Sequence, residues 1–101
     1  MDETNWTALH WAAAKGKEAV AAQLLQARAS VTAVENNYES TPLHYAAAYG
    51  KAQVVDLLLQ AKASPTAVDK FGLTPAQRAE QGGHTDLAAR LRQAEQAPSS
   101  M

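Results

Sequence analysis

Two kinds of apolar segment alternate along the chain, and each kind predicts a helix. Short Ala-rich segments, as at 12–14 and 46–48, lie between a Thr and a Gly. Thr is a preferred residue just before a helix, and Gly readily takes the left-handed conformation that ends one. We therefore predict short first helices between three such pairs: Thr7 and Gly16, Thr41 and Gly50, Thr74 and Gly83. Segments richer in Leu and Val predict second helices over 18–27, 52–61 and 85–93.

The helices recur because the sequence itself repeats. Residues 7–16 align with 41–50, and residues 24–30 align with 58–64. A weaker third copy starts at Thr74. Thr41 follows Thr7 by 34 positions and Thr74 follows Thr41 by 33, so the first repeat carries one extra residue, which we place around 34–37. A fixed period of this length predicts helix pairs stacked side by side in a solenoid.

The repeated motif resembles that of the ankyrin repeat family. Residues 41–46 match the family's Thr-Pro-Leu-His-x-Ala motif, and the spacing matches its 33-residue period. The resemblance covers residues 2 to about 94. It implies an all-α solenoid of three helix-turn-helix repeats, at about 2–35, 36–68 and 69–94, with projecting β-turn loops. One domain would then span 1–95, and 96–101 would form a disordered tail.

Polar residues at fixed offsets from each Thr predict caps and turns. Three positions after the Thr lies a side chain that can bond back to it, and we interpret these as capping residues: His10, His44 and Gln77. Pro42 and Pro75 suit the first helical position. Five positions before the Thr lies a short polar side chain that can bond the backbone two residues on: Asp2, Asn36 and Asp69.

Three residues stand where the resemblance implies Gly. Arg28 and Lys62 follow second helices, so we predict left-handed backbone torsions for both. Their charges are either solvated at helix ends or form basic contacts for an acidic partner. Glu39 lies two positions before Thr41, next to the extra residue, and we expect the turn of that loop to differ from the family pattern.

The ends of the stack should be more polar than its middle. We compared two second-helix positions across the repeats: Gln23, Leu57 and Arg90, then Leu25, Leu59 and Arg92. The middle repeat is apolar at both positions and the third is polar at both. We therefore interpret the third repeat as a C-terminal cap, with Arg90 and Arg92 facing outward, and expect Gln23 to face outward at the front.

Composition narrows the function classes. The formal net charge is −1, which argues against a nucleic-acid or membrane-surface partner. The chain has no Cys, which excludes disulfides, thiol nucleophiles and Cys-based metal sites. No apolar run approaches the roughly 18–20 residues of a membrane span. Residues 1–5 are polar and acidic, unlike a signal peptide, so we expect an intracellular protein, cytoplasmic or nuclear.

Catalytic and metal-binding interpretations are weaker than structural ones. His10 and His44 occupy equivalent positions in successive repeats, so we expect them about 10 Å apart, too far to share a metal ion. We interpret both as structural, and His84 as a loop or N-cap residue. The chain is therefore expected not to be an enzyme and to need no cofactor or metal.

The aromatic residues point to a binding surface. Tyr38 and Phe71 each lie three positions before a Thr, in the projecting loops, and Tyr49 ends a first helix. Such positions line the concave groove in the family. We interpret Trp11 and Tyr45 as packing residues. The predicted groove comprises Trp6, Lys15, Tyr38, Ser40, Tyr49, Lys70, Phe71 and Leu73.

The resemblance implies a non-catalytic protein–protein interaction module that acts as a monomer. Lys15, Lys51 and Lys70 place positive charge along the stack, which favours a partner segment that is acidic or apolar. The alternative is a structural or regulatory subunit packed permanently into a larger assembly.

Overall fold

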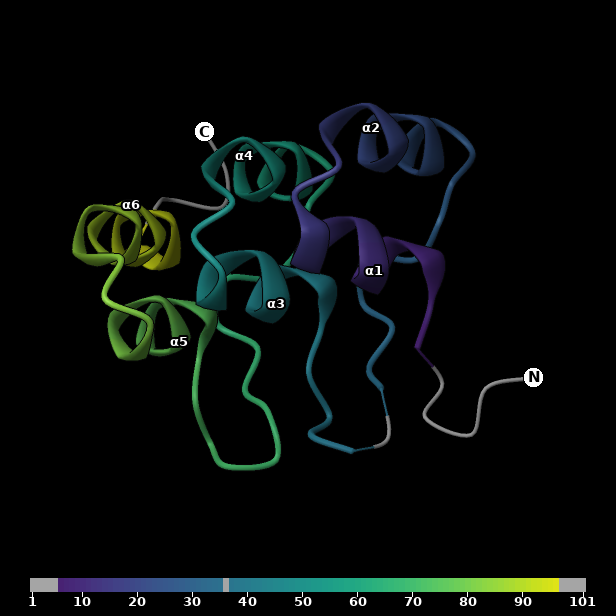
Figure 1. The fold of residues 1–101 in the computed structure, drawn as a ribbon. Helices are drawn as coiled ribbons and strands as arrows, with labels where there is room; N and C mark the ends of the chain where they lie inside the picture. The colour runs from purple at the N-terminus through teal and green to yellow at the C-terminus, as the bar shows by residue number, and fades with distance from the viewer. Residues whose placement is uncertain (1–5, 36, 97–101) are drawn as a thin grey trace.

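The computed structural model describes residues 6–35 and 37–96, and within them it contains helices and no strand. The helices follow the predicted pairs: α1 (Ala8–Lys15) with α2 (Glu18–Gln26), α3 (Pro42–Ala48) with α4 (Ala52–Gln60), and α5 (Pro75–Gln81) with α6 (Thr85–Gln96). The first helices form one layer and the second helices the other (Figure 1). The predicted all-α solenoid of three helix pairs is therefore confirmed.

The predicted caps define the start of every first helix. Thr7, Thr41 and Thr74 each accept a bond from the backbone N–H three residues on, and the side chain of that residue bonds back to the Thr. These three capping boxes satisfy donors that an uncapped helix leaves free. The first helices end where the backbone turns left-handed, at the predicted residues Gly16, Gly50 and Gly83.

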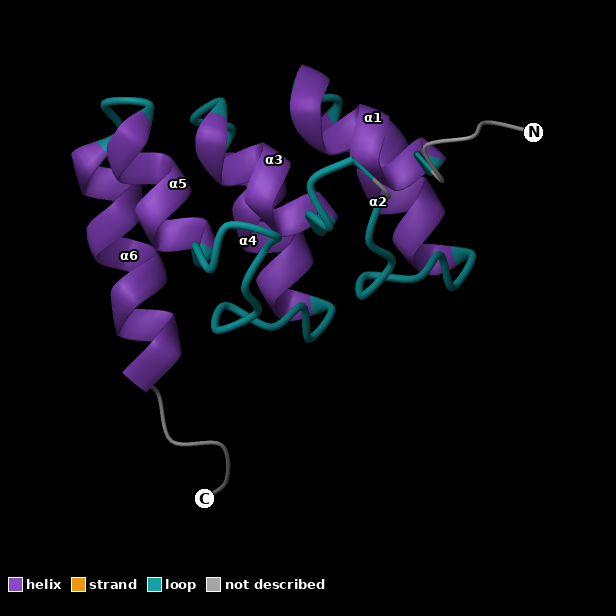
Figure 2. Ribbon diagram, turned by 90° about the horizontal axis from the view of Figure 1, so that it is seen from below, coloured by secondary structure: helices purple, strands orange, loops and turns teal. Residues whose placement is uncertain are grey.

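Small side chains let the helices of neighbouring repeats pack closely. Ala12 and Ala13 of α1 are fully buried, as are Ala46 and Ala47 of α3. Helix α3 lies between α1 and α5 in the first layer, seen from the loop side in Figure 2. The larger core residues fill the space between the layers: Leu9, Leu43, Val54, Val55, Leu58 and Leu91. The loops that lead into α3 and α5 thereby start from one closely packed layer of helices.

The second helices differ slightly from the predicted bounds. Helices α2 and α4 end one residue early, at Gln26 and Gln60, because the left-handed residues Arg28 and Lys62 close them. Helix α6 continues to Gln96, beyond the predicted end at 93, and no residue described after Gly83 has a positive φ that would end it. Gln96, assigned to the tail from sequence, is thus helical, and 97–101 lie outside the described residues.

Polar side chains are exposed at both ends of the stack, as expected. Gln23 is exposed on α2 in the first repeat, and Arg90 and Arg92 are exposed on α6 in the third. Arg92 forms an ion pair of 2.6 Å with Glu80, and Arg90 reaches back to pair with Asp56 of α4. His84, directly before α6, is half-buried, and its ring lies over Gly50 where a Cβ would clash at 2.6 Å.

Candidate functional site

The loop before α3 is organised by the buried carboxylate of Glu35. Its Oε1 accepts the backbone N–H groups of Asn37 and Tyr38 at 2.7 and 3.0 Å. Its Oε2 accepts the N–H of Ser40 at 3.2 Å and the hydroxyl of Tyr45 at 3.0 Å. Burial alone would raise the pKa of Glu35, but these hydrogen bonds stabilise the carboxylate and hold the pKa below its usual value.

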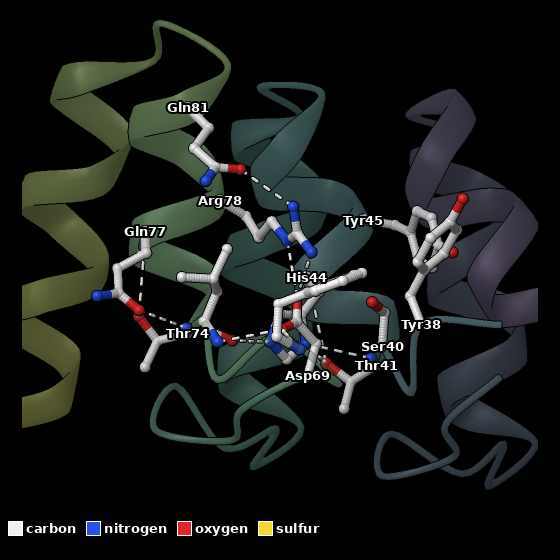
Figure 3. A network of polar contacts seen from close by, with 12 residues as sticks. Tyr38, Ser40, Thr41, His44, Tyr45, Asp69, Thr74, Gln77, Arg78 and Gln81 are labelled. Atoms are coloured by element: carbon white, nitrogen blue, oxygen red, sulfur yellow. Dashed lines mark hydrogen bonds and ion pairs between the residues drawn. The ribbon is translucent and has the colours of Figure 1, made fainter. Parts of the chain in front are cut away.

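The loop before α5 uses Asp69 in the same way. Its Oδ1 accepts the backbone N–H groups of Phe71 and Leu73 at 2.9 and 3.0 Å. The bond to Phe71, two residues on, confirms the predicted turn at Asp69. Its Oδ2 accepts Nε of Arg78 at 2.7 Å, and Figure 3 shows the guanidinium pointing toward it. Burial raises the pKa of Asp69, but the bonds from Leu73 and Arg78 outweigh it and lower that pKa.

The two loops differ by the predicted extra residue. Backbone bonds close the first between Glu35 and Ser40, and the second between Asp69 and Leu73. The first loop is one residue longer, and its carboxylate side chain is also longer. Glu35 thus accepts backbone N–H groups of the first loop as Asp69 does in the second. Glu39, at φ 54°, takes the left-handed conformation of its counterpart Gly72, at φ 77°. The turns predicted at Asp2 and Asn36 lie outside the described residues.

His10 and His44 connect each repeat to the next loop. Nδ1 of His44 accepts the backbone N–H of Thr41 at 3.1 Å, so the ring proton lies on Nε2, which donates to the carbonyl of Leu73 at 2.8 Å. His10 makes the same pair of bonds, to Thr7 at 3.2 Å and to the carbonyl of Ser40 at 2.9 Å. Burial lowers the pKa of both rings, so each is neutral and both nitrogens are used.

Aromatic side chains gather beside these loops. The Tyr38 and Phe71 rings come from successive loops and lie 6.0 Å apart between centroids, and Tyr49 stands at the end of α3. All three side chains are about half exposed, at 49%, 58% and 56%. Together with Tyr45 and Arg78 they line a pocket of about 320 Å³. The sequence correctly placed these three rings at the surface, and the structure brings them to one pocket.

Sequence comparison with known families identifies the architecture that carries this pocket. A family model described as "Ankyrin repeats (3 copies)" matches residues 1–69. The chain belongs to the ankyrin repeat family. No curated protein matched the chain in a separate search. The third ankyrin unit, α5 and α6, lies beyond the family match, yet Thr74 and Gln77 give it the same capping box as the first two.

Other predicted site residues have mixed positions in the ankyrin fold. Lys15 and Lys70 are exposed. Trp6 is half-buried, and its ring packs on Tyr45 at 4.6 Å and on His10 at 5.4 Å between centroids.

Ser40 and Leu73 serve the loops through their backbone. Ser40 is 4% exposed and Leu73 is half-buried. In each, the N–H bonds the loop carboxylate and the carbonyl bonds a His of the preceding repeat. Both residues thus hold the ankyrin loops in place beside the pocket.

The sequence interpretation missed the roles of two residues that organise this site, Glu35 and Arg78. Glu35 precedes Asn36, the residue that we aligned with Asp69. An alignment with the extra residue placed after Glu35 would have identified Glu35 as the counterpart of Asp69.

Arg78 lies four positions after Thr74, as Tyr45 does after Thr41. Each of these side chains bonds the carboxylate of the loop before its own helix. Trp11, at the same offset in the first ankyrin unit, is exposed to 41%, whereas we had interpreted it as a packing residue.

Neither a metal-binding cluster nor a membrane-spanning helix occurs among the described residues. Within 6–35 and 37–96, no cluster of three His, Asp or Glu side chains could hold a metal ion. No helix among those residues is long and apolar enough to cross a membrane. Ankyrin-repeat domains are generally protein–protein interaction modules and are typically non-catalytic.

Proposed function

We propose that this ankyrin domain is a monomeric, non-catalytic module that binds a segment of a partner protein on the face formed by its loops and first helices. The observation that carries the proposal is the group of half-exposed rings at Tyr38, Tyr49 and Phe71 around one pocket. Apolar rings gain free energy when a partner removes them from water, and they are common at the centres of interfaces.

Rigid support makes these rings suitable for binding. The backbone N–H of Lys70 donates to the carbonyl of Tyr38 at 2.8 Å, so the two loops are bonded to each other beside the rings. Glu35 and Asp69 fix each loop from inside. A surface that is ordered before binding loses little conformational entropy when the partner arrives.

The proposal is tested by capture and then by titration. The domain is used to isolate a partner, and the purified partner segment is titrated against the domain and its variants. Tyr49→Ala and Phe71→Ala should each weaken binding by about 1–3 kcal/mol while leaving the circular dichroism spectrum unchanged. Val68→Ala is the matched control, since Val68 is equally exposed but does not line the pocket. Equal affinity of Tyr49→Ala, Phe71→Ala and Val68→Ala for the partner segment would contradict the proposal.

The first repeat supports the second candidate, a subunit packed end-on into a larger assembly. Val20 on α2 is 37% exposed, whereas Val54, its equivalent on α4, is fully buried in the core. The front end thus exposes an apolar side chain at a position that the middle repeat buries. Loss of partner binding on Val20→Lys, with no effect of Tyr49→Ala, would favour this candidate.

A further inference from the structure

The pocket between the loops has walls that are mainly aromatic. The rings of Tyr38, Tyr45, Tyr49 and Phe71 line it, together with Arg78 and the short side chain of Ala48. Its volume of about 320 Å³ lies at the lower end of the range for small-ligand pockets, which is about 300–1,000 Å³. A space of this size accommodates one large side chain of a partner.

The buried polar side chains that line the pocket are already bonded within the chain. The Tyr45 hydroxyl donates to Glu35, and both ring nitrogens of His44 are used. Among the described residues, no buried side-chain nitrogen or oxygen lacks a partner. A ligand therefore meets mostly apolar surface beside Tyr45 and His44, and a polar side chain placed there would lose its bonds to water without replacement.

Arg78, which lines the pocket, favours a ligand with negative charge. Its guanidinium carbon lies 5.6 Å from the centroid of the Phe71 ring, so the chain itself already supplies a cation to this ring. Nε and both Nη atoms bond to Asp69 or Gln81. A guanidinium has five N–H groups, so two remain for a ligand. A second cation would be repelled here, whereas a carboxylate could accept both remaining donors.

Charges farther from the pocket do not reverse this preference. Glu39 and Lys70 are both exposed on the loops and have opposite signs. Asp69 has no exposed side-chain surface and is occupied by Arg78, so it is inaccessible to a ligand. The Glu35 carboxylate is buried under its own four donors. Among the residues that line the pocket, Arg78 is the one with a charged side chain.

We propose that this pocket binds an aromatic side chain of the partner segment and that Arg78 binds a carboxylate beside that ring. The ring packs against Tyr38, Tyr49 and Phe71 in the offset-stacked or edge-to-face arrangements that aromatic pairs prefer. The carboxylate accepts the free N–H groups of Arg78. This inference rests on the proposed function and specifies the chemistry of the partner: an acidic segment with an aromatic anchor.

Three small molecules with the same ring test the inference without knowledge of the partner. We would titrate the ¹⁵N-labelled full chain with 3-phenylpropanoate, its neutral amide and 3-phenylpropylammonium, and follow backbone amide shifts. We expect 3-phenylpropanoate to bind with a Kd of about 1–10 mM, at least about threefold more tightly than the amide, and the ammonium to bind most weakly. The shifts should centre on Tyr38, Tyr49, Phe71 and Arg78.

Variants connect the shifts to the pocket. Tyr49→Ala should weaken 3-phenylpropanoate binding at least about fivefold, and Val68→Ala should leave it unchanged. Preference for the ammonium, shifts centred elsewhere, or no binding of any of the three would overturn the inference. If the small molecules fail while Tyr49→Ala still weakens partner binding, the inference is wrong and the proposed function stands. If 3-phenylpropanoate binds as expected but Tyr49→Ala leaves partner binding unchanged, the proposed function is wrong.

Discussion

Among the described residues other than Gly, three have positive φ: Arg28 at 69°, Glu39 at 54° and Lys62 at 74°. In this conformation the Cβ crowds the following carbonyl, at a cost of roughly 1–2 kcal/mol per residue. Arg28 and Lys62 follow α2 and α4, where a cation near the helix C-terminus recovers about 0.3–1 kcal/mol. At Arg28 and Lys62 the electrostatic gain thus offsets part of the backbone strain.

Replacing Lys62 by Gly should be neutral or should raise the free energy of unfolding by up to about 1 kcal/mol. Relief of the strained backbone opposes the larger unfolded-state entropy of Gly and the lost charge. Gln60→Gly is the matched control, because Gln60 is helical and exposed, and Gly there should cost about 0.5–1 kcal/mol. Urea unfolding measures both, and an equal loss in the two variants would contradict the role assigned to the torsion.

His44 performs two tasks that two substitutions can separate. His44→Ala should lower the free energy of unfolding by about 2–4 kcal/mol, because it removes a buried ring and leaves the Leu73 carbonyl without its donor. His44→Gln should cost less, since Gln77 shows that Gln can cap a Thr, accepting the N–H of Thr74 at 2.9 Å. Urea unfolding of both variants would show this order, and equal losses would mean that the cap contributes nothing.

At the scale of the elements, each loop depends on a buried carboxylate and a partner on the following helix. Asp69 has no exposed side-chain surface and forms its ion pair with Arg78 at 2.7 Å. The exposed pair of Arg92 and Glu80, at 2.6 Å, has similar geometry but a different environment. The comparison isolates the effect of burial on an ion pair within one repeat.

Arg78→Ala should lower the free energy of unfolding by about 3–5 kcal/mol, because it leaves the Asp69 charge buried without its cation. Arg92→Ala should cost less than about 1 kcal/mol, since water solvates Glu80 in its place. Thermal unfolding of the two variants at the same pH would show the difference. Similar small losses would indicate that the two backbone N–H bonds to Asp69 suffice to hold the loop.

The sequence predicts the helices better than the loops, for a physical reason. Caps at Thr7, Thr41 and Thr74 are local, so residues three apart suffice to define them. The role of Glu35 depends instead on where the extra residue enters the loop and on Tyr45, ten positions away. Alignment by distance from Thr41 selected Asn36 instead. The exposure of Tyr38 and Phe71 was predictable from their loop positions, but their shared pocket with Arg78 required three-dimensional contacts.

At the scale of the whole molecule, the two ends of the stack are unequal. On α2, Ala21 is the buried residue, whereas α4 buries Val54, Val55 and Leu58. Helix α6 buries Leu87, Ala88 and Leu91 and bears exposed ion pairs on Arg90 and Arg92. In a stack where each repeat contacts only its neighbours, stability is a sum of repeat and interface contributions. The first repeat is therefore expected to contribute less stability to the stack than the third.

Native-state hydrogen exchange should show α2 opening before α4 and α6. Local opening exposes little apolar surface at α2, so its free energy of opening should be the lowest of the second helices. A pair of equivalent substitutions checks the cause: Val54→Ala should cost about 1–3 kcal/mol of unfolding free energy and Val20→Ala less than about 1, since only Val54 is fully buried. Exchange at α6 before α2 would mean that the polar end is the weaker one. A partner that covers the front end would slow exchange at α2 without slowing it around Tyr49. A partner in the pocket would slow exchange around Tyr49 without slowing it at α2. The same measurement therefore separates the two candidate functions.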